Sequence, residues 1–121
     1  MFNENGKAIY LQIVDFICEE ILAGKLSAGE RLPSVREYAA RMQVNPNTMM
    51  RSYEYLASRD IIFNSRGIGY FLGEKARDIV SRMKRDELLG KEINDIFRRL
   101  NLLDVSPELL KEYYEKYLES L

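Results

Sequence analysis

Polar side chains gather at the start of a short segment whose spacing predicts a helix. Asn45, Asn47, Thr48 and Arg51 all fall within its first turns. Amide, hydroxyl and guanidinium groups are the donors and acceptors that read base edges in the major groove of DNA. A helix that only packs against a core has no need of them at one end. We therefore expect this helix to meet a DNA groove.

A helix-turn-helix would position these side chains. Ser34 is the expected N-cap of the first helix, and Glu37 completes a capping box. Residues 43–45 form the turn, and Pro46 suits the first position of the second helix, which is predicted to end near residue 58. The residues of this second helix that are expected to face the core are apolar or aromatic and recur at helical spacing: Met49, Tyr53 and Leu56.

A preceding helix and a following hairpin flank the helix-turn-helix. Apolar residues predict an amphipathic helix over residues 8–23, ended by Gly24. Residues 61–63 and 68–72 favour strands, and Asn64-Ser65-Arg66-Gly67 is a turn signal between them. This hairpin is a wing with Arg66 near its tip, and Gly67 and Gly69 add no bulky side chain to it. The sequence thus predicts a mainly α winged helix-turn-helix domain over residues 1–73.

Residues 74–121 predict a short α-helical region that serves dimerisation. Residues 74–89 are highly charged, residues 91–103 carry one apolar stripe, and Ser106-Pro107 begins a last helix. So small a region cannot bury its apolar groups alone, so we expect it to pack on a second copy. The expected interface residues are apolar or aromatic: Ile93, Phe97, Leu100, Leu110, Tyr113, Tyr114 and Tyr117. The three tyrosines could instead line a ligand cage.

Composition restricts the class of protein. The chain has 121 residues, of which 46% are hydrophobic and 31% charged, as in globular proteins. It has no apolar run of membrane-spanning length, and its first residues do not resemble a signal peptide, so we expect a cytoplasmic protein without membrane contact. There is no histidine, and the one cysteine, Cys18, is assigned to the core. We therefore predict no enzyme activity, no metal and no cofactor.

The formal net charge of −1 is a weak guide to partners because the charges are segregated. Residues 36–66 hold five arginines and three acidic residues, and residues 75–99 are also basic. Residues 100–121 are acidic. Solvated helix faces show such runs as often as DNA-binding surfaces do, so the pattern only supports the other signals.

Four motifs resemble the GntR family of bacterial transcription regulators. They are Ile9-Tyr10-Leu11-Gln12-Ile13, Gly24-Lys25-Leu26-Ser27-Ala28-Gly29-Glu30-Arg31-Leu32-Pro33-Ser34-Val35-Arg36, Val44-Asn45-Pro46-Asn47-Thr48 and Arg66-Gly67-Ile68-Gly69-Tyr70-Phe71. The resemblance covers residues 8–73. The Asn-Pro-Asn-Thr turn and the short helical C-terminal region look like the YtrA subfamily.

The resemblance implies a homodimeric repressor that binds double-stranded DNA at a pseudo-palindromic operator, in this subfamily often of a transporter operon. Carried over by position, three groups of residues would contact DNA: Ser34 and Arg36 at phosphates, Asn45, Asn47, Thr48 and Arg51 in the major groove, and Arg66, Gly67 and Gly69 in a wing at the minor groove. Many family members have arginine where Met50 stands, so which of Asn47, Thr48 and Arg51 reads bases stays open. The sequence identifies neither the operator nor a small-molecule effector.

Structural roles compete with these assignments. Arg36 could pair with Glu37 or Glu54 on the surface, Arg51 could be solvated, and Asn45 could serve only as a cap. A winged helix can also serve protein contacts without specific DNA binding. An apolar outer face on the second helix of the motif would indicate that function, whereas the side chains there are polar.

Overall fold

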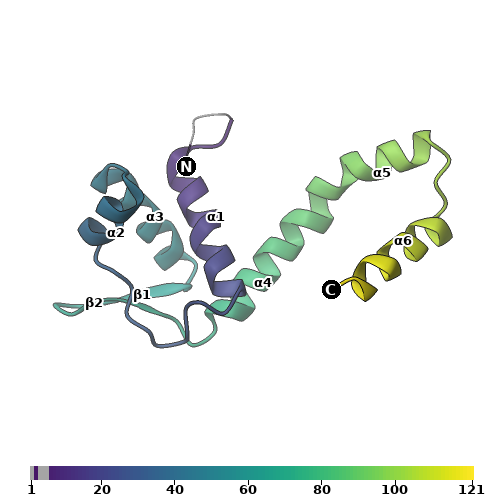
Figure 1. Cartoon of the computed structure of the whole chain (residues 1–121). Coiled ribbons are helices and arrows are strands. Elements are labelled where there is room, and N and C mark those ends of the chain that lie inside the picture. The colour runs from purple at the N-terminus through teal and green to yellow at the C-terminus, as the bar shows by residue number, and fades with distance from the viewer. Residues whose placement is uncertain (1, 3–5) are drawn as a thin grey trace. The chain divides into compact units, whose positions relative to one another are not determined.

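A computed structural model describes residue 2 and residues 6–121 (Figure 1). Met1 and residues 3–5, on which the expectation of no signal peptide depends, lie outside the described residues. The chain divides into two compact units, Met1–Met83 and Lys84–Leu121.

The first unit contains three short helices and a two-stranded hairpin. Helices α1 (Ile9–Leu22), α2 (Val35–Met42) and α3 (Pro46–Ser58) precede strands β1 (Ile62–Ser65) and β2 (Gly69–Leu72), and α4 (Ala76–Glu87) begins in this unit. Figure 1 shows α2 and α3 beside α1, with the hairpin turn extending away from the helices. The predicted winged helix-turn-helix is therefore confirmed, and α3 ends where the sequence indicated.

Local sequence explains how the helices begin and end. The Ser34 hydroxyl accepts a hydrogen bond from the Glu37 backbone N–H at 3.1 Å, and the Asn45 side-chain oxygen accepts one from the Asn47 N–H at 2.7 Å. Both are N-caps, as predicted. Gln43 ends α2 in the left-handed conformation with a φ of 55°, and Gly24 follows α1 with a φ of 78°.

The hairpin turn lies later in the chain than the sequence indicated. β1 pairs antiparallel with β2 in a register that sets Asn64 opposite Tyr70 and Ser65 opposite Gly69. Asn64 and Ser65 therefore belong to the strand, and the turn is formed by residues 66–68, with the Ile68 N–H donating to the Ser65 carbonyl at 2.9 Å. The correction follows from backbone conformation, because the glycines that supply positive φ are Gly67 and Gly69, at 80° and 137°.

A short segment before α2 adds a third row of backbone hydrogen bonds to the hairpin. The Leu32 N–H donates to the Tyr70 carbonyl at 2.8 Å, and the Leu72 N–H donates to the Glu30 carbonyl at 2.9 Å. Arg31 lies opposite Phe71 in this pairing. The sequence predicted only a turn over residues 25–30, and did not predict that backbone hydrogen bonds would join β2 to the segment before α2.

The core of the first unit lies between α1, α3, the hairpin and the start of α4. Its largest fully buried side chains are mostly apolar, with one serine among them: Ile13, Ile17, Cys18, Ile21, Met49, Ser52, Tyr53, Leu56, Ile61, Ile62 and Val80. Cys18 lies in this core, as predicted. Ala76 is also buried, and Ile79 and Met83 pack against the core.

The boundary between the two units falls after Met83, later in the chain than the boundary at residue 73 that the sequence predicted. The reason is that the first turns of α4 bury Ala76 and Val80 in the core of the first unit. The assignment of DNA binding to residues 1–73 and dimerisation to residues 74–121 stays a prediction.

The second unit is helical and exposes its apolar side chains. The end of α4 continues through a π-helical segment, Leu88–Glu92, into α5 (Ile93–Leu102), and the chain then turns into α6 (Pro107–Glu119). Ser106 caps α6 by accepting a hydrogen bond from the Leu109 N–H at 3.1 Å. No residue from 84 to 121, a stretch that the structure describes throughout, is buried within the single chain. Among the described residues, no helix has the length and apolarity that a membrane span requires.

Candidate nucleic-acid interface

The N-terminal end of α2 presents Ser34 and Arg36. Ser34 uses its hydroxyl oxygen to cap the helix, which leaves its O–H available as a donor. Arg36 is exposed, and no ion pair or hydrogen bond joins its guanidinium to another described residue. The surface pairs with Glu37 or Glu54 that the sequence allowed are not formed. Because Ser34 is the N-cap of α2 and Arg36 is in its first turn, both lie at the positive end of the helix dipole, where anions bind well.

The first two turns of α3 carry the four residues expected at the major groove. Asn45 caps the helix, Asn47 is exposed in its first turn, and Thr48 is half-exposed. The backbone carbonyl of Thr48 accepts a hydrogen bond from the Ser52 hydroxyl at 3.2 Å. This bond does not involve the side-chain hydroxyl of Thr48. These three residues lie at the N-terminal end of α3, and their contact with the major groove stays a prediction.

Arg51 lies against a residue of α1 instead of extending alone into solvent. Its guanidinium carbon is 4.1 Å from the centroid of the Tyr10 ring, a cation–π contact. The neighbouring Ser52 is buried, and its hydroxyl donates to the Tyr10 carbonyl at 2.8 Å. Both contacts join α3 to the first turn of α1. Arg51 is exposed and also contacts the Tyr10 ring, and its assignment to the major groove stays a prediction.

The hairpin presents Arg66, Gly67 and Gly69 near its turn. Arg66 is exposed, and none of the described residues forms an ion pair with it. A β-carbon added at Gly69 would lie 3.1 Å from the side-chain Nε of Arg31. Glycine at this position therefore leaves room for the Arg31 side chain to lie along the hairpin. Sequence reasoning did not single out Arg31, because its place beside the hairpin depends on the third row of pairing.

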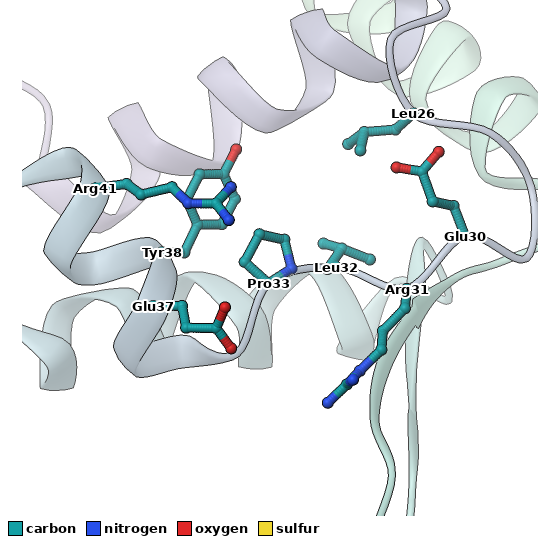
Figure 2. A pocket seen from close by; sticks show the side chains of 8 residues that line it. All are labelled: Leu26, Glu30, Arg31, Leu32, Pro33, Glu37, Tyr38 and Arg41. Atoms are coloured by element: carbon teal, nitrogen blue, oxygen red, sulfur yellow. The ribbon is translucent and has the colours of Figure 1, made fainter.

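An open pocket of about 360 Å³ lies between α2 and the segment that precedes it (Figure 2). Its charged lining consists of two arginines and two glutamates: Glu30, Arg31, Glu37 and Arg41. In Figure 2 the Arg31 side chain points away from Tyr38 and Arg41 and runs beside the strands of the hairpin. The pocket is thus lined by charges of both signs and carries no functional assignment.

The outer face of α3 decides between DNA contact and protein contact. Its exposed residues are polar apart from Pro46 at the first position and Met50, which is 37% exposed. A protein-docking helix would expose a continuous apolar stripe, as α5 and α6 do. Among the described residues, no group of three potential metal ligands occurs. The arrangement supplies hydrogen-bond donors and positive charge on a helix and a wing.

This fold and these side chains define a winged helix-turn-helix DNA-binding protein. Residues 9–72 match the family described as bacterial regulatory proteins, gntR family. The chain belongs to the GntR family of transcriptional regulators, and its relatives place it with the YtrA-like members. Members of this family are transcriptional regulators and not enzymes.

Two relatives from Bacillus subtilis (strain 168) match nearly the whole chain. The HTH-type transcriptional regulator YhcF is 35% identical over 116 residues, which cover 96% of this chain and 94% of YhcF. The HTH-type transcriptional repressor YtrA is 31% identical over 108 residues, which cover 89% of this chain and 82% of YtrA.

The fold is also similar to a crystal structure of a GntR-family transcriptional regulator from Bacteroides thetaiotaomicron. The TM-score is 0.82 at 42% sequence identity, and the match covers 93% of this chain and 98% of the other. The match therefore includes the helices of the second unit as well as the winged helix. Regulation of transcription through DNA binding follows from the family.

Proposed function

We propose that the chain is a homodimeric repressor that binds a pseudo-palindromic operator and blocks transcription of a transporter operon. The observation that carries the proposal is the N-terminal half of α3, which presents amide, hydroxyl and guanidinium groups away from the core. The similarity to the repressor YtrA supports the direction of regulation. As a DNA-binding regulator without a membrane partner, it acts in the cytoplasm.

In the proposed mechanism, phosphate contacts set the register and α3 reads the sequence. Ser34 and Arg36 contact phosphates at the start of α2, and the wing with Arg66, Gly67 and Gly69 approaches the minor groove. Asn45, Asn47 and Thr48 lie in the major groove with Arg51. Arg51 reads a guanine, because a guanidinium fork matches the O6 and N7 atoms of that base.

Exposed apolar residues of the second unit support dimerisation. Seven residues are assigned to the interface, and the five most exposed are Phe97, Leu110, Tyr113, Tyr114 and Tyr117. Ile93 and Leu100, which complete the set, are half-exposed. Burying this surface in a second copy removes apolar area from water and gives the unit the core that one chain lacks. The tyrosines thus serve the dimer and not a ligand cage.

The first test is fluorescence anisotropy on the protein's own promoter fragment and on a scrambled fragment, across a salt series. Specific binding predicts a preference of about a thousandfold or more and a logarithmic salt dependence with a steep slope. Equal weak binding to both fragments would contradict operator recognition at this site.

Single variants separate base reading from phosphate contact. Arg51→Ala should weaken operator binding by about 1–3 kcal/mol and relax the preference at one base position. Arg36→Ala should weaken operator and random DNA alike and lower the salt slope by about one. Arg59→Ala is the matched control, because Arg59 stacks on Tyr55 at the other end of α3. Equal losses on both DNAs for Arg51→Ala would refute the base-reading role.

Two phenylalanines of similar exposure, one inside and one outside the proposed interface, allow a controlled test of dimerisation. Phe97 in α5 is 47% exposed and Phe63 in the hairpin is 49% exposed. Phe97→Asp should raise the dimer dissociation constant by about tenfold or more, because a buried unpaired charge is costly. Phe63→Asp should leave the dimer intact in sedimentation without DNA. If Phe97→Asp remains as dimeric as the wild type, the proposed interface is wrong.

A further inference from the structure

Arg51 and Tyr10 form a contact that the proposed DNA-binding roles do not yet use. Tyr10 is in the first turn of α1, and the guanidinium carbon of Arg51 lies over the Tyr10 ring, 4.1 Å from its centroid. Tyr10 is half-exposed and Arg51 is exposed, so the pair lies at the surface. We propose that Tyr10 is the positioning residue for Arg51, holding its guanidinium ready for DNA; this inference rests on the proposed DNA-binding role of Arg51.

The geometry leaves the hydrogen-bonding edge of Arg51 available. A guanidinium is planar, and its N–H donors point outward in that plane. The contact is made with the face of the Tyr10 ring, which has no oxygen or nitrogen atom to accept a hydrogen bond from those donors. No hydrogen bond or ion pair joins the Arg51 side chain to another described residue. A phosphate or a base edge can therefore engage the donors while the ring contact remains.

A buried hydrogen bond keeps the two partners in register. The Ser52 side chain is fully buried, and its hydroxyl donates to the Tyr10 carbonyl at 2.8 Å. Because Ser52 directly follows Arg51, this bond ties the backbone of α3 beside Arg51 to the residue that carries the ring. The relative placement of ring and guanidinium is thus set by core packing before DNA is present.

Holding the arginine in place favours binding through entropy. A free arginine side chain loses rotamer freedom when DNA immobilises it, and prior stacking lowers that loss. Exposed cation–π contacts contribute on the order of 0.5–1 kcal/mol. At 1.4 kcal/mol per tenfold change, this corresponds to about two- to fivefold in operator affinity. Tyr10→Leu should therefore weaken operator binding by about two- to fivefold.

The experiment measures operator dissociation constants for wild type, Tyr10→Leu, Tyr10→Phe, Arg51→Ala and the Tyr10→Leu/Arg51→Ala double variant. Tyr10→Phe keeps the ring and should bind like wild type. Tyr10→Leu should lose affinity only while Arg51 is present, so the double variant should match Arg51→Ala. Tyr55→Leu is the matched control, because it removes the equivalent stack on Arg59, at 3.8 Å, and should leave binding unchanged.

Three results would overturn the inference. Wild-type affinity in Tyr10→Leu would show that the ring does not assist Arg51. A loss that persists in the Arg51→Ala background, or a loss in Tyr10→Phe, would show that Tyr10 acts by itself. If Arg51→Ala binds the operator as wild type does, the proposed role of Arg51 fails first, and the two failures are thus distinguished.

A second readout does not depend on DNA. An aromatic ring facing the guanidinium should shift the Arg51 Nε–Hε proton upfield in a proton–nitrogen correlation spectrum of the full chain. The shift should persist in Tyr10→Phe and disappear in Tyr10→Leu. A wild-type Arg51 resonance at the position of a solvated arginine would overturn the inference.

Discussion

Tyr53 joins the helix that carries the proposed reading residues to the start of α2. Its side chain is fully buried, and its hydroxyl donates to the Pro33 carbonyl at 2.6 Å. Pro33 directly precedes Ser34, the N-cap of α2. Replacing Tyr53 with phenylalanine removes the donor and keeps the ring. The variant therefore isolates one hydrogen bond between the two helices of the motif.

The expected magnitude follows from what the variant leaves behind. The ring still packs edge-on against Tyr38 and Tyr70, at centroid distances of 6.4 Å and 4.9 Å. No large cavity forms, so the cost comes from the lost bond and from the Pro33 carbonyl that loses its donor. A net hydrogen bond contributes about 1 kcal/mol, and an acceptor that loses its donor away from water raises the cost to about 3 kcal/mol, which is the upper limit for the half-buried Pro33. We expect Tyr53→Phe to lower the free energy of unfolding by about 1–3 kcal/mol.

The assay is equilibrium urea denaturation followed by circular dichroism. The midpoint should fall while the slope with denaturant stays constant, because the exposed area on unfolding is unchanged. Tyr55→Phe is the control; Tyr55 is half-exposed, and its change should stay within about 0.5 kcal/mol. A Tyr53→Phe protein as stable as wild type would refute the argument that this bond secures α2 to α3.

Three further predictions concern pH, a glycine and a cap. Burial raises the pKa of Tyr53 and of Tyr38 above the ordinary value of 10.0. The folded state then retains protons that the unfolded state has lost, so stability should fall as pH rises above 10.0. The contribution of the fully buried Tyr53 is at most about 1.4 kcal/mol per pH unit, so the fall should be less steep in Tyr53→Phe. Urea midpoints at alkaline pH check this, and equal slopes would contradict it. Gly73→Ala should lower the stability measured by thermal melting by about 1–3 kcal/mol, because the added β-carbon would lie 2.9 Å from a backbone oxygen. Gly90→Ala is the control: its β-carbon meets nothing within 4 Å, so the stability should not change. Asn45→Asp keeps the N-cap, so the variant should have the melting temperature of wild type. It should bind the operator about tenfold more weakly, because it places a negative charge beside DNA. Unchanged binding would mean that Asn45 serves only as a cap.

Local signals explain why most of the winged helix could be predicted from sequence. The apolar spacing in α1 and α3 reflects helix geometry, and Ser34 and Asn45 cap their helices through bonds to residues only two or three positions away. The hairpin was also recognisable, but its turn was misplaced. Asn64 and Ser65 are acceptable in a turn and in a short strand, and the paired register decided between the two.

By itself, the sequence determined the winged helix-turn-helix, its family, and the polar and basic residues on α2, α3 and the wing. Only the tertiary structure decided how the segments before α2 and after β2 attach to that frame. The pairing of Arg31 opposite Phe71, the burial of Ala76 and Val80, and the stacking of Arg51 on Tyr10 join residues far apart in the chain. No periodicity or cap encodes such contacts, because they depend on which surfaces remain adjacent once the core has packed.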